Sequence, residues 1–416
     1  MKKALLLLLL CACLAALGAT TFTSKSLLFA DSFMLRAKGC EANYWNPALL
    51  NENTHDLWIP ALNTGIFLGN NSLNLDLYNY IMDREYLTAE DKQHIMDAID
   101  NKIAFEMGGQ IGIFGITFGN VALSSSIHMG ARSAFSEEYL QLLLYGNGDG
   151  SQVYEFTEEE NYLEALSYTD ITIGVGDIKA PLPEKFPPIR FGFAGSLLGG
   201  IGNAHTEDLY GMFSSNLDGL TVQQDVLLRT GAAGYGFKGM VGMVIEPIPF
   251  VKAGITLDNI FGFINWGLVR QDLTAHFAID SLYAIDIQDD FYEYDYSRTK
   301  GDPYTTKLPL ELRLSGMFHT NQVSFTADYV KGFDDGAEVS KQGRFALGVE
   351  LKPLPFIQVH LGYGSGNDNY PWRVAYGIGL NLKAVEFGLG IQSIENFLPG
   401  SSSKGIAFGN YFNIRI

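Results

Sequence analysis

The sequence predicts an all-β fold, a transmembrane antiparallel β-barrel of about 14 strands, within a range of roughly 12 to 16. Three observations predict it. From about Leu57 onward, large apolar residues alternate with glycine or polar residues, which is the period of a β-strand. Glycine dominates the second set, as expected for residues that face a lumen rather than bulk water. The chain also begins with an export signal and ends on a strand pattern.

Residues 1–18 have the features of a signal peptide. Two lysines precede an apolar run, and Ala16 and Gly18 place small residues before the cleavage point. The run is about 14 residues long, which is too short for a helix that spans a bilayer. Lipidation at Cys13 is the alternative to cleavage after Gly18. We therefore expect export, and with the barrel pattern we expect the bacterial outer membrane.

Beyond the signal, the chain divides into two parts. Residues 19–56 show no period, whereas residues 57–416 are expected to form the barrel. No later apolar stretch approaches the roughly 18 residues of a membrane helix. Cys40 is the one cysteine after the signal, so no internal disulfide is predicted.

The clearest hairpin lies near the C-terminus. In the stretch 374–382, valine, tyrosine, isoleucine and leucine alternate with alanine, glycine and asparagine. A tight turn near Lys383 and Ala384 leads into 385–392, which repeats the alternation. A soluble sandwich would bury the apolar face, whereas a membrane barrel turns it to lipid. The glycine-rich second face favours the barrel.

Two proline-rich stretches, 246–257 and 352–363, resemble each other. Proline cannot donate a ladder hydrogen bond, so these prolines predict strand reversals. Phe250 and Phe356 would then lie near one membrane interface, as an aromatic girdle does. Two unrelated turns of similar chemistry are the alternative.

The opposite strand ends are expected to carry long polar segments. The acidic stretch 286–296 predicts an extended loop, with a hairpin beyond the bilayer as the alternative. Residues 204–220 and 330–342 predict shorter polar loops.

Two loop insertions are expected to be helical. Thr88 with Asp91 forms a capping pattern ahead of an apolar series. Ser136 opens a second segment with two glutamates after it, and Gly146 can end it.

The composition argues against several functions. The chain has 46 acidic and 28 basic residues and a net charge of -18, with no basic cluster for nucleic acid. The seven histidines lack metal-ligand spacing, and there is no Gly-x-Ser-x-Gly elbow. We therefore expect no enzyme activity, no metal and no cofactor.

The segment "YWNPALL" resembles the Asn-Pro-Ala motif of the long-chain fatty-acid transporter (FadL) superfamily, at Asn46, Pro47 and Ala48. In that family the motif belongs to an N-terminal hatch folded inside a 14-stranded barrel, and the resemblance implies that residues 19–56 form such a plug here. The stretch "RAKGCEANYW" resembles the segment that leads into the motif. The chain also resembles an uncharacterised branch, a domain of unknown function, in which a helix near "TAEDKQHIMDAI" follows the first strand and an "LLLYGN" segment follows the third.

The resemblance implies passive uptake or binding of a hydrophobic small molecule, with outer-membrane lipid as the surrounding partner. Tyr44, Trp45, Asn46, Pro47 and Ala48 are then the expected plug and gating residues. Proline fixes its own φ and favours an extended residue before it, and the asparagine can satisfy buried backbone groups. An ordinary turn without a gating role is the alternative.

Two further expectations complete the interpretation. Phe33 and Met34 are expected to contact the ligand, on the basis of their apolar character within the plug. The rival function is a structural or assembly barrel, a surface scaffold with a blocked lumen whose long loops bind a partner. The sequence indicates neither the substrate nor the oligomeric state.

Overall fold

The computed structural model describes residues 22–51, 55–99, 101–147, 152–183, 185–216, 219–282, 292–336 and 339–415. The predicted signal peptide and Cys13 lie outside the described residues.

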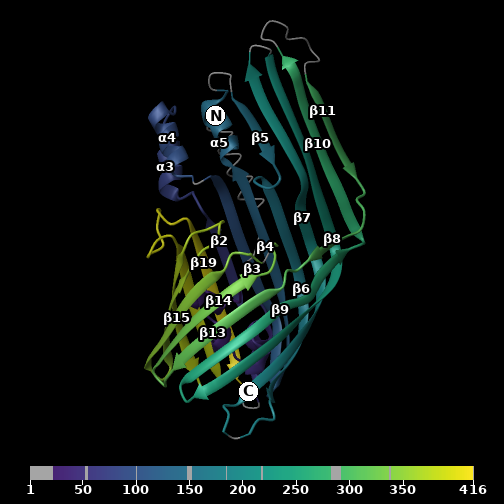
Figure 1. Cartoon of the computed structure of the whole chain (residues 1–416). Coiled ribbons are helices and arrows are strands. Elements are labelled where there is room, and N and C mark those ends of the chain that lie inside the picture. The colour runs from purple at the N-terminus through teal and green to yellow at the C-terminus, as the bar shows by residue number, and fades with distance from the viewer. Residues whose placement is uncertain are drawn as a thin grey trace.

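Fourteen strands close into an antiparallel barrel, which confirms the predicted fold class (Figure 1). Each strand pairs with its neighbour around the wall, and β19 closes the ring by pairing with β2, where Phe408 lies opposite Ile66. The short strand β1 (Asp56–Trp58) pairs with both β3 and β19. The wall consists of β2 (Thr64–Asn70), β3 (Lys102–Phe118), β4 (Val121–Ser136), β6 (Tyr162–Lys179), β7 (Ile189–Asn216), β8 (Gly219–Ile248), β9 (Val251–Trp266), β13 (Glu311–His319), β14 (Val323–Gly332), β15 (Arg344–Leu354), β16 (Ile357–Gly364), β17 (Arg373–Leu382), β18 (Val385–Ile394) and β19 (Gly405–Arg415).

The alternation in the sequence matches the two faces of the wall. Phe193 is 50% exposed, whereas the next residue, Ala194, is 9% exposed. On β17, Ile378 is 56% exposed on the outer face, while Gly377 faces the plug residue Leu28. Large apolar side chains therefore cover the outside, and glycine and polar residues line the lumen.

Short turns join strands at the lower end of the barrel. β8 ends at Ile248 and β9 begins at Val251, and β15 ends at Leu354 and β16 begins at Ile357. The two proline-rich stretches therefore contain strand reversals, as predicted. The hairpin of β17 and β18 also turns where the sequence indicated.

Two strands continue well above the wall. β7 and β8 are 28 and 30 residues long, and β5 (Val153–Thr157), β10 (Val269–Leu282) and β11 (Glu293–Thr299) pair with their upper parts or with each other. Figure 1 shows this upper sheet rising on one side of the barrel. The short β12 (Tyr304–Lys307) pairs with β9.

The upper sheet corrects one prediction about the loops. The loop expected over 204–220 is wrong, because β7 runs on to Asn216 and pairs with β8 along its whole upper length. Most side chains there are half-exposed, so polar residues are compatible with a strand. Part of the loop expected over 286–296 forms β11, and 283–291 lies outside the described residues. β14 extends to Gly332, and a loop follows it as expected.

Three helices lie beside the upper end of β3 and β4. α4 (Ala89–Asp97) begins with the predicted capping box of Thr88 and Asp91. α5 (Glu137–Tyr145) ends at Gly146, although the Ser136 side chain makes no capping bond. The sequence interpretation missed α3 (Leu75–Met82), which Asn74 caps by accepting a bond from the Leu77 amide at 2.8 Å. These helices share a buried cluster with Ile103 and Phe105 of β3.

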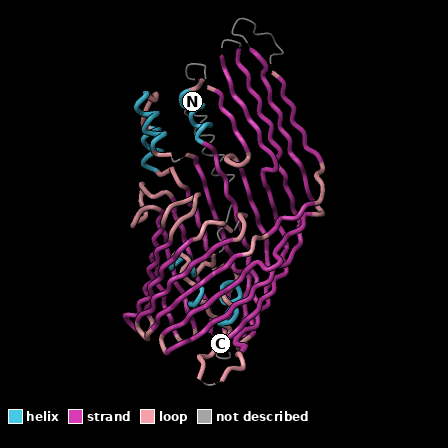
Figure 2. Tube along the Cα trace, viewed as in Figure 1, coloured by secondary structure: helices cyan, strands magenta, loops and turns pink. Residues whose placement is uncertain are grey.

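The segment before β1 folds into short helical turns inside the lower part of the barrel (Figure 2). We call residues 22–51 the plug. It contains η1 (Ser26–Phe29), η2 (Met34–Arg36), η3 (Gly39–Glu41), α2 (Ala42–Trp45) and η4 (Pro47–Leu49). In the described part of the chain, no helix is long and apolar enough to cross a membrane.

Candidate functional site

Asn46, Pro47 and Ala48 form the turn between α2 and the last helical turn of the plug. Asn46 is extended, with φ -158° and ψ 102°, as a residue before proline prefers. Its side-chain Oδ1 accepts a hydrogen bond from the Ala48 amide at 3.0 Å. Pro47 then occupies the first position of η4, where its missing N–H costs nothing. The three residues therefore form a small, self-capped turn.

This turn sits against glycines of the lumen wall. A Cβ added at Gly192 of β7 would lie 2.2 Å from the Ala48 nitrogen, and one added at Gly242 of β8 would lie 2.0 Å from Asn46 Oδ1. The Asn46 Nδ2 also donates to the carbonyl of Met243 at 3.4 Å. We call Gly192 and Gly242 the glycine seat, because a larger residue at either position would collide with the turn.

Tyr44 is buried against the wall on the other side of α2. Its ring stacks on Trp58 with centroids 6.0 Å apart and an interplanar angle of 13°. Its hydroxyl donates to Asp170 Oδ1 of β6 at 3.3 Å. The hydroxyl of Tyr44 thus holds the plug to the wall.

Trp45 lies at the centre of the plug and is 2% exposed. Its Nε1 donates to Thr23 Oγ1 at 3.1 Å, so one end of the plug closes on the other. The Arg313 guanidinium lies 4.8 Å from the Trp45 ring centroid, in reach of a cation–π interaction.

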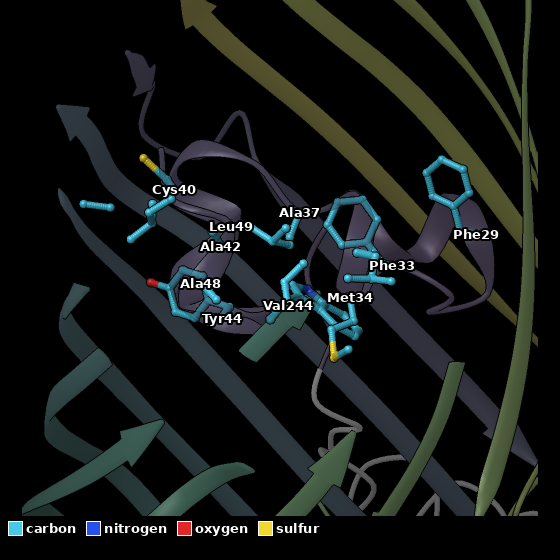
Figure 3. Close-up of a cluster of buried hydrophobic side chains, with 14 of the residues drawn as sticks. Phe29, Phe33, Met34, Ala37, Cys40, Ala42, Tyr44, Ala48, Leu49 and Val244 are labelled. Carbon is cyan, nitrogen blue, oxygen red and sulfur yellow. The ribbon is translucent and has the colours of Figure 1, made fainter. Parts of the chain in front are cut away.

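Phe33 and Met34 are both 1% exposed and lie in the same apolar cluster as Trp45 (Figure 3). The Phe33 ring lies 5.6 Å from the ring of Trp45, edge to face. The Met34 sulfur accepts a hydrogen bond from Thr256 Oγ1 at 3.3 Å. Both side chains pack against other plug residues and against the wall. That they contact a ligand stays a prediction.

Ion pairs that the sequence interpretation did not single out also hold the plug. Arg313 of β13 donates to the Tyr44 carbonyl at 2.8 Å and pairs with Asp258 at 3.1 Å, entirely out of solvent. The plug residue Asp31 pairs with Arg373 of β17 at 2.8 Å. In the sequence, the alternation that places Arg313 and Arg373 on the lumen face of their strands is the one signal that points to them.

Two cationic plug residues also bind the wall, Lys25 by an ion pair and Arg36 by hydrogen bonds. Lys25 lies 2.7 Å from Glu386 of β18. Arg36 donates to Ser324 Oγ of β14 and to the carbonyl of Gly348 of β15 at 3.1 Å. The plug is therefore tied to several parts of the wall by charged groups, in addition to its apolar cluster.

No group of three or more His, Cys, Asp or Glu residues within the described ranges is placed to hold a metal ion. The lumen contacts described above are hydrogen bonds, ion pairs and apolar packing. They can hold or release a segment of chain, and they include no arrangement of nucleophile and base.

Comparison with solved structures returns FadL-family channels, the group that the Asn46–Pro47–Ala48 motif resembles. The toluene transporter TodX of P. putida is 10% identical, with 96% of this chain and 99% of that chain covered and a TM-score of 0.47. A Pseudomonas aeruginosa FadL homologue is 9% identical, with 95% and 99% covered and a TM-score of 0.48. The CymD monoaromatic hydrocarbon channel is 9% identical, with 91% and 93% covered and a TM-score of 0.43.

Because these identities are near a tenth, we base the functional proposal on this chain's own residues. No curated protein matches the chain. A family described as a family of unknown function, DUF5723, matches residues 47–269, which is more than half of the 416 residues. The chain therefore belongs to the DUF5723 family.

Proposed function

We propose that this protein is an outer-membrane barrel that gives hydrophobic small molecules a passive route past a movable plug. Support for the membrane comes from the outer face of the wall, where side chains such as Leu197, Ile173 and Leu347 are 66%, 56% and 53% exposed. Exposed apolar groups of this size on every side of a closed barrel are stable in lipid and costly in water.

The observation that carries the proposal is the plug inside the lumen. It brings an apolar cluster, including Phe33, Met34 and Trp45, into a lumen otherwise lined with glycine and polar groups. If the plug shifts, a hydrophobic compound can replace the contacts that these side chains now make with one another. Capture from outside, passage around the plug and lateral or periplasmic release then form the route.

In this proposal, Tyr44, Trp45, Asn46, Pro47 and Ala48 set the position of the plug. The self-capped turn and the glycine seat hold this segment against β7 and β8, and the bond from Tyr44 to Asp170 holds it against β6. The double variant Asn46→Ala with Pro47→Ala removes the cap and the fixed φ, so we expect altered uptake of a hydrophobic probe with folded protein retained. Asn265→Ala, at a half-exposed asparagine of β9 that contacts Thr305 and not the plug, is the matched control.

A reversible lock tests the proposal more directly. A Cβ added at Gly115 of β3 would lie 2.7 Å from the Cys40 sulfur and 3.0 Å from the Cys40 Cβ. Gly115→Cys can therefore form a disulfide between plug and wall once the two Cβ atoms move apart by about 0.5 Å or more, to the roughly 3.5–4.5 Å of a relaxed bond. We expect uptake of a hydrophobic probe to stop in the oxidised variant and to return after reduction. Gly115→Ser, which fills the same space without a bond, is the control. Uptake that continues unchanged with the lock closed would contradict a route that needs plug movement.

The second candidate function is a scaffold barrel with a permanently blocked lumen, and one observation favours it. The plug is held by buried ion pairs on several strands, including Asp31 with Arg373 and Lys25 with Glu386. Charged groups then fill the lumen, and no continuous apolar channel runs through it in this second candidate function. Absence of hydrophobic uptake in the wild type, together with a partner bound through the upper sheet, would support the scaffold.

A further inference from the structure

An apolar groove lies on the outside of the upper wall, away from the plug. It encloses about 520 Å³ between α3 and the loop 395–404 that joins β18 to β19. Cavities of roughly 300–1,000 Å³ are typical of small-molecule sites. Its apolar lining includes Leu68, Leu75, Tyr78, Ile81, Phe105 and Ile406.

The floor of the groove belongs to the lipid-facing surface. Leu68 of β2 and Ile406 of β19 are cross-strand partners, 36% and 46% exposed. Their neighbours Phe67 and Ala407 point the other way, into a buried cluster that includes plug residues. The groove is therefore continuous with the apolar outer face of the barrel, and a compound dissolved in the membrane can enter it without crossing water.

The polar side chains that line the groove already have partners within the protein. Lys404, the cation of the lining, lies 2.6 Å from Glu395. The Asn70 Nδ2 donates to the backbone carbonyls of Leu73 and Lys404 at 2.9 and 2.7 Å. Asn74 accepts from the α3 backbone as its cap. Among the described lining residues, no unpaired cation remains for a carboxylate or a phosphate, so a charged head group would gain nothing here.

From this chemistry we propose that the groove binds uncharged apolar small molecules dissolved in the outer leaflet, as the first station of the uptake route. The role in uptake rests on the proposed function, whereas the binding itself does not. A fatty acid or the chain of a phospholipid is a poorer occupant, because each brings an anion to a place where the nearby lysine is already neutralised by Glu395.

The test uses the full-length protein in vesicles with two photoreactive probes, an alkyl diazirine without a head group and its carboxylate analogue. Mapping of the labelled peptides should place the neutral probe on 68–81 and 399–406, with at least severalfold less labelling by the carboxylate. Equal or stronger labelling by the carboxylate would overturn the neutral assignment. Labelling spread evenly over the whole wall would show only ordinary solvation by lipid and would also overturn it.

A variant that places a charge in the groove tests whether the labelling depends on the apolar lining. Leu75 is 60% exposed at the first position of α3, where an acidic residue suits the helix, so Leu75→Glu should fold. We expect it to lower labelling of the groove by about tenfold, because it places a charge in an apolar site. Tyr86→Glu, at a 74% exposed position outside the lining, should leave labelling unchanged. Unchanged labelling in Leu75→Glu would refute the site.

Uptake separates the two proposals. If the groove is labelled but wild-type cells take up no hydrophobic probe, the binding site stands and the uptake function fails. If Leu75→Glu loses groove labelling yet takes up the probe at the wild-type rate, the function stands and the groove is removed from the route. Heat-modifiable migration of each variant confirms that its barrel is folded.

Discussion

Replacing Gly192 with alanine tests whether the glycine seat holds the plug. The added Cβ would lie 2.2 Å from both the Ala48 nitrogen and the Pro47 carbonyl carbon, which are backbone atoms that no rotamer change can move. Relief of this contact requires a shift of about 1 Å or more. Overpacking costs roughly 1–3 kcal/mol. The cost falls on the seated plug alone, so the displaced population should rise about 5- to 150-fold.

The native thiol of Cys40 gives the readout. It is fully buried in η3, with its sulfur 3.3 Å from Thr117 Oγ1, so it reacts with a maleimide only when the plug leaves its place. The labelling rate of folded Gly192→Ala should therefore exceed the wild-type rate by a factor within that range. Cys40→Ser gives the background, and denatured protein gives the full reaction.

Gly316→Ala is the matched control, because a Cβ at this position meets no atom within 4 Å. This variant makes the same glycine-to-alanine change in a strand, at a position that does not contact the plug. Its Cys40 should react with the maleimide at the wild-type rate. Wild-type labelling of Gly192→Ala would refute the reasoning that the seat controls the whole plug. Equal acceleration in both variants would show that the effect comes from glycine replacement in strands and not from the seat.

Two further predictions concern charged groups. Arg313→Met removes the guanidinium that pairs with both Asp258 and Glu311, and it leaves these buried carboxylates with the more distant cations Lys238 at 3.7 Å and Arg344 at 3.9 Å. The loss should cost up to roughly 3–5 kcal/mol and lower the temperature at which the unboiled barrel unfolds in a gel-shift assay; an unchanged temperature would contradict the pairing. The hydroxyl of Tyr80 and the backbone at Thr88 hold the pKa of Asp91 below its ordinary value of 3.8. Its stabilisation of α4 is therefore present above about pH 4 and lost as the pH falls through the lowered pKa. Hydrogen-exchange protection of α4 at pH 6 should fall in Asp91→Asn, and equal protection would refute the cap.

The sequence predicted the wall because one physical rule governs it. Lipid outside and a narrow lumen inside force apolar and small residues to alternate, so stretches such as 374–382 reveal both the strand and its inner face. The capping box of Thr88 was equally visible, since it depends on neighbouring residues alone. Asn46, Pro47 and Ala48 stood out by their resemblance, and the structure places them against Gly192 and Gly242 on the lumen face of the wall.

The features above the wall were harder to predict. Outside lipid, the two faces of a strand no longer differ strongly in polarity, so residues 204–216 resembled a loop while they continue β7. α3 is eight residues long and depends on packing against its neighbours more than on its own pattern. Asp258 is distant in sequence from its partner Arg313, as Asp31 is from Arg373, and only the closed barrel brings each pair together.

The ion pairs between the plug and the wall affect how a passive route through the lumen can open. In a dry core, separating Asp31 from Arg373 or Lys25 from Glu386 would cost several kcal/mol each, more than a neutral cargo supplies. A shifted plug, however, lets water into a lumen whose wall is already polar, and hydrated ion pairs are worth about 0–1 kcal/mol. An apolar contact between plug and wall would gain nothing from that water. The ion pairs between plug and wall therefore favour an opening in which water enters the lumen. They argue against a movement of the plug that excludes water from these ion pairs.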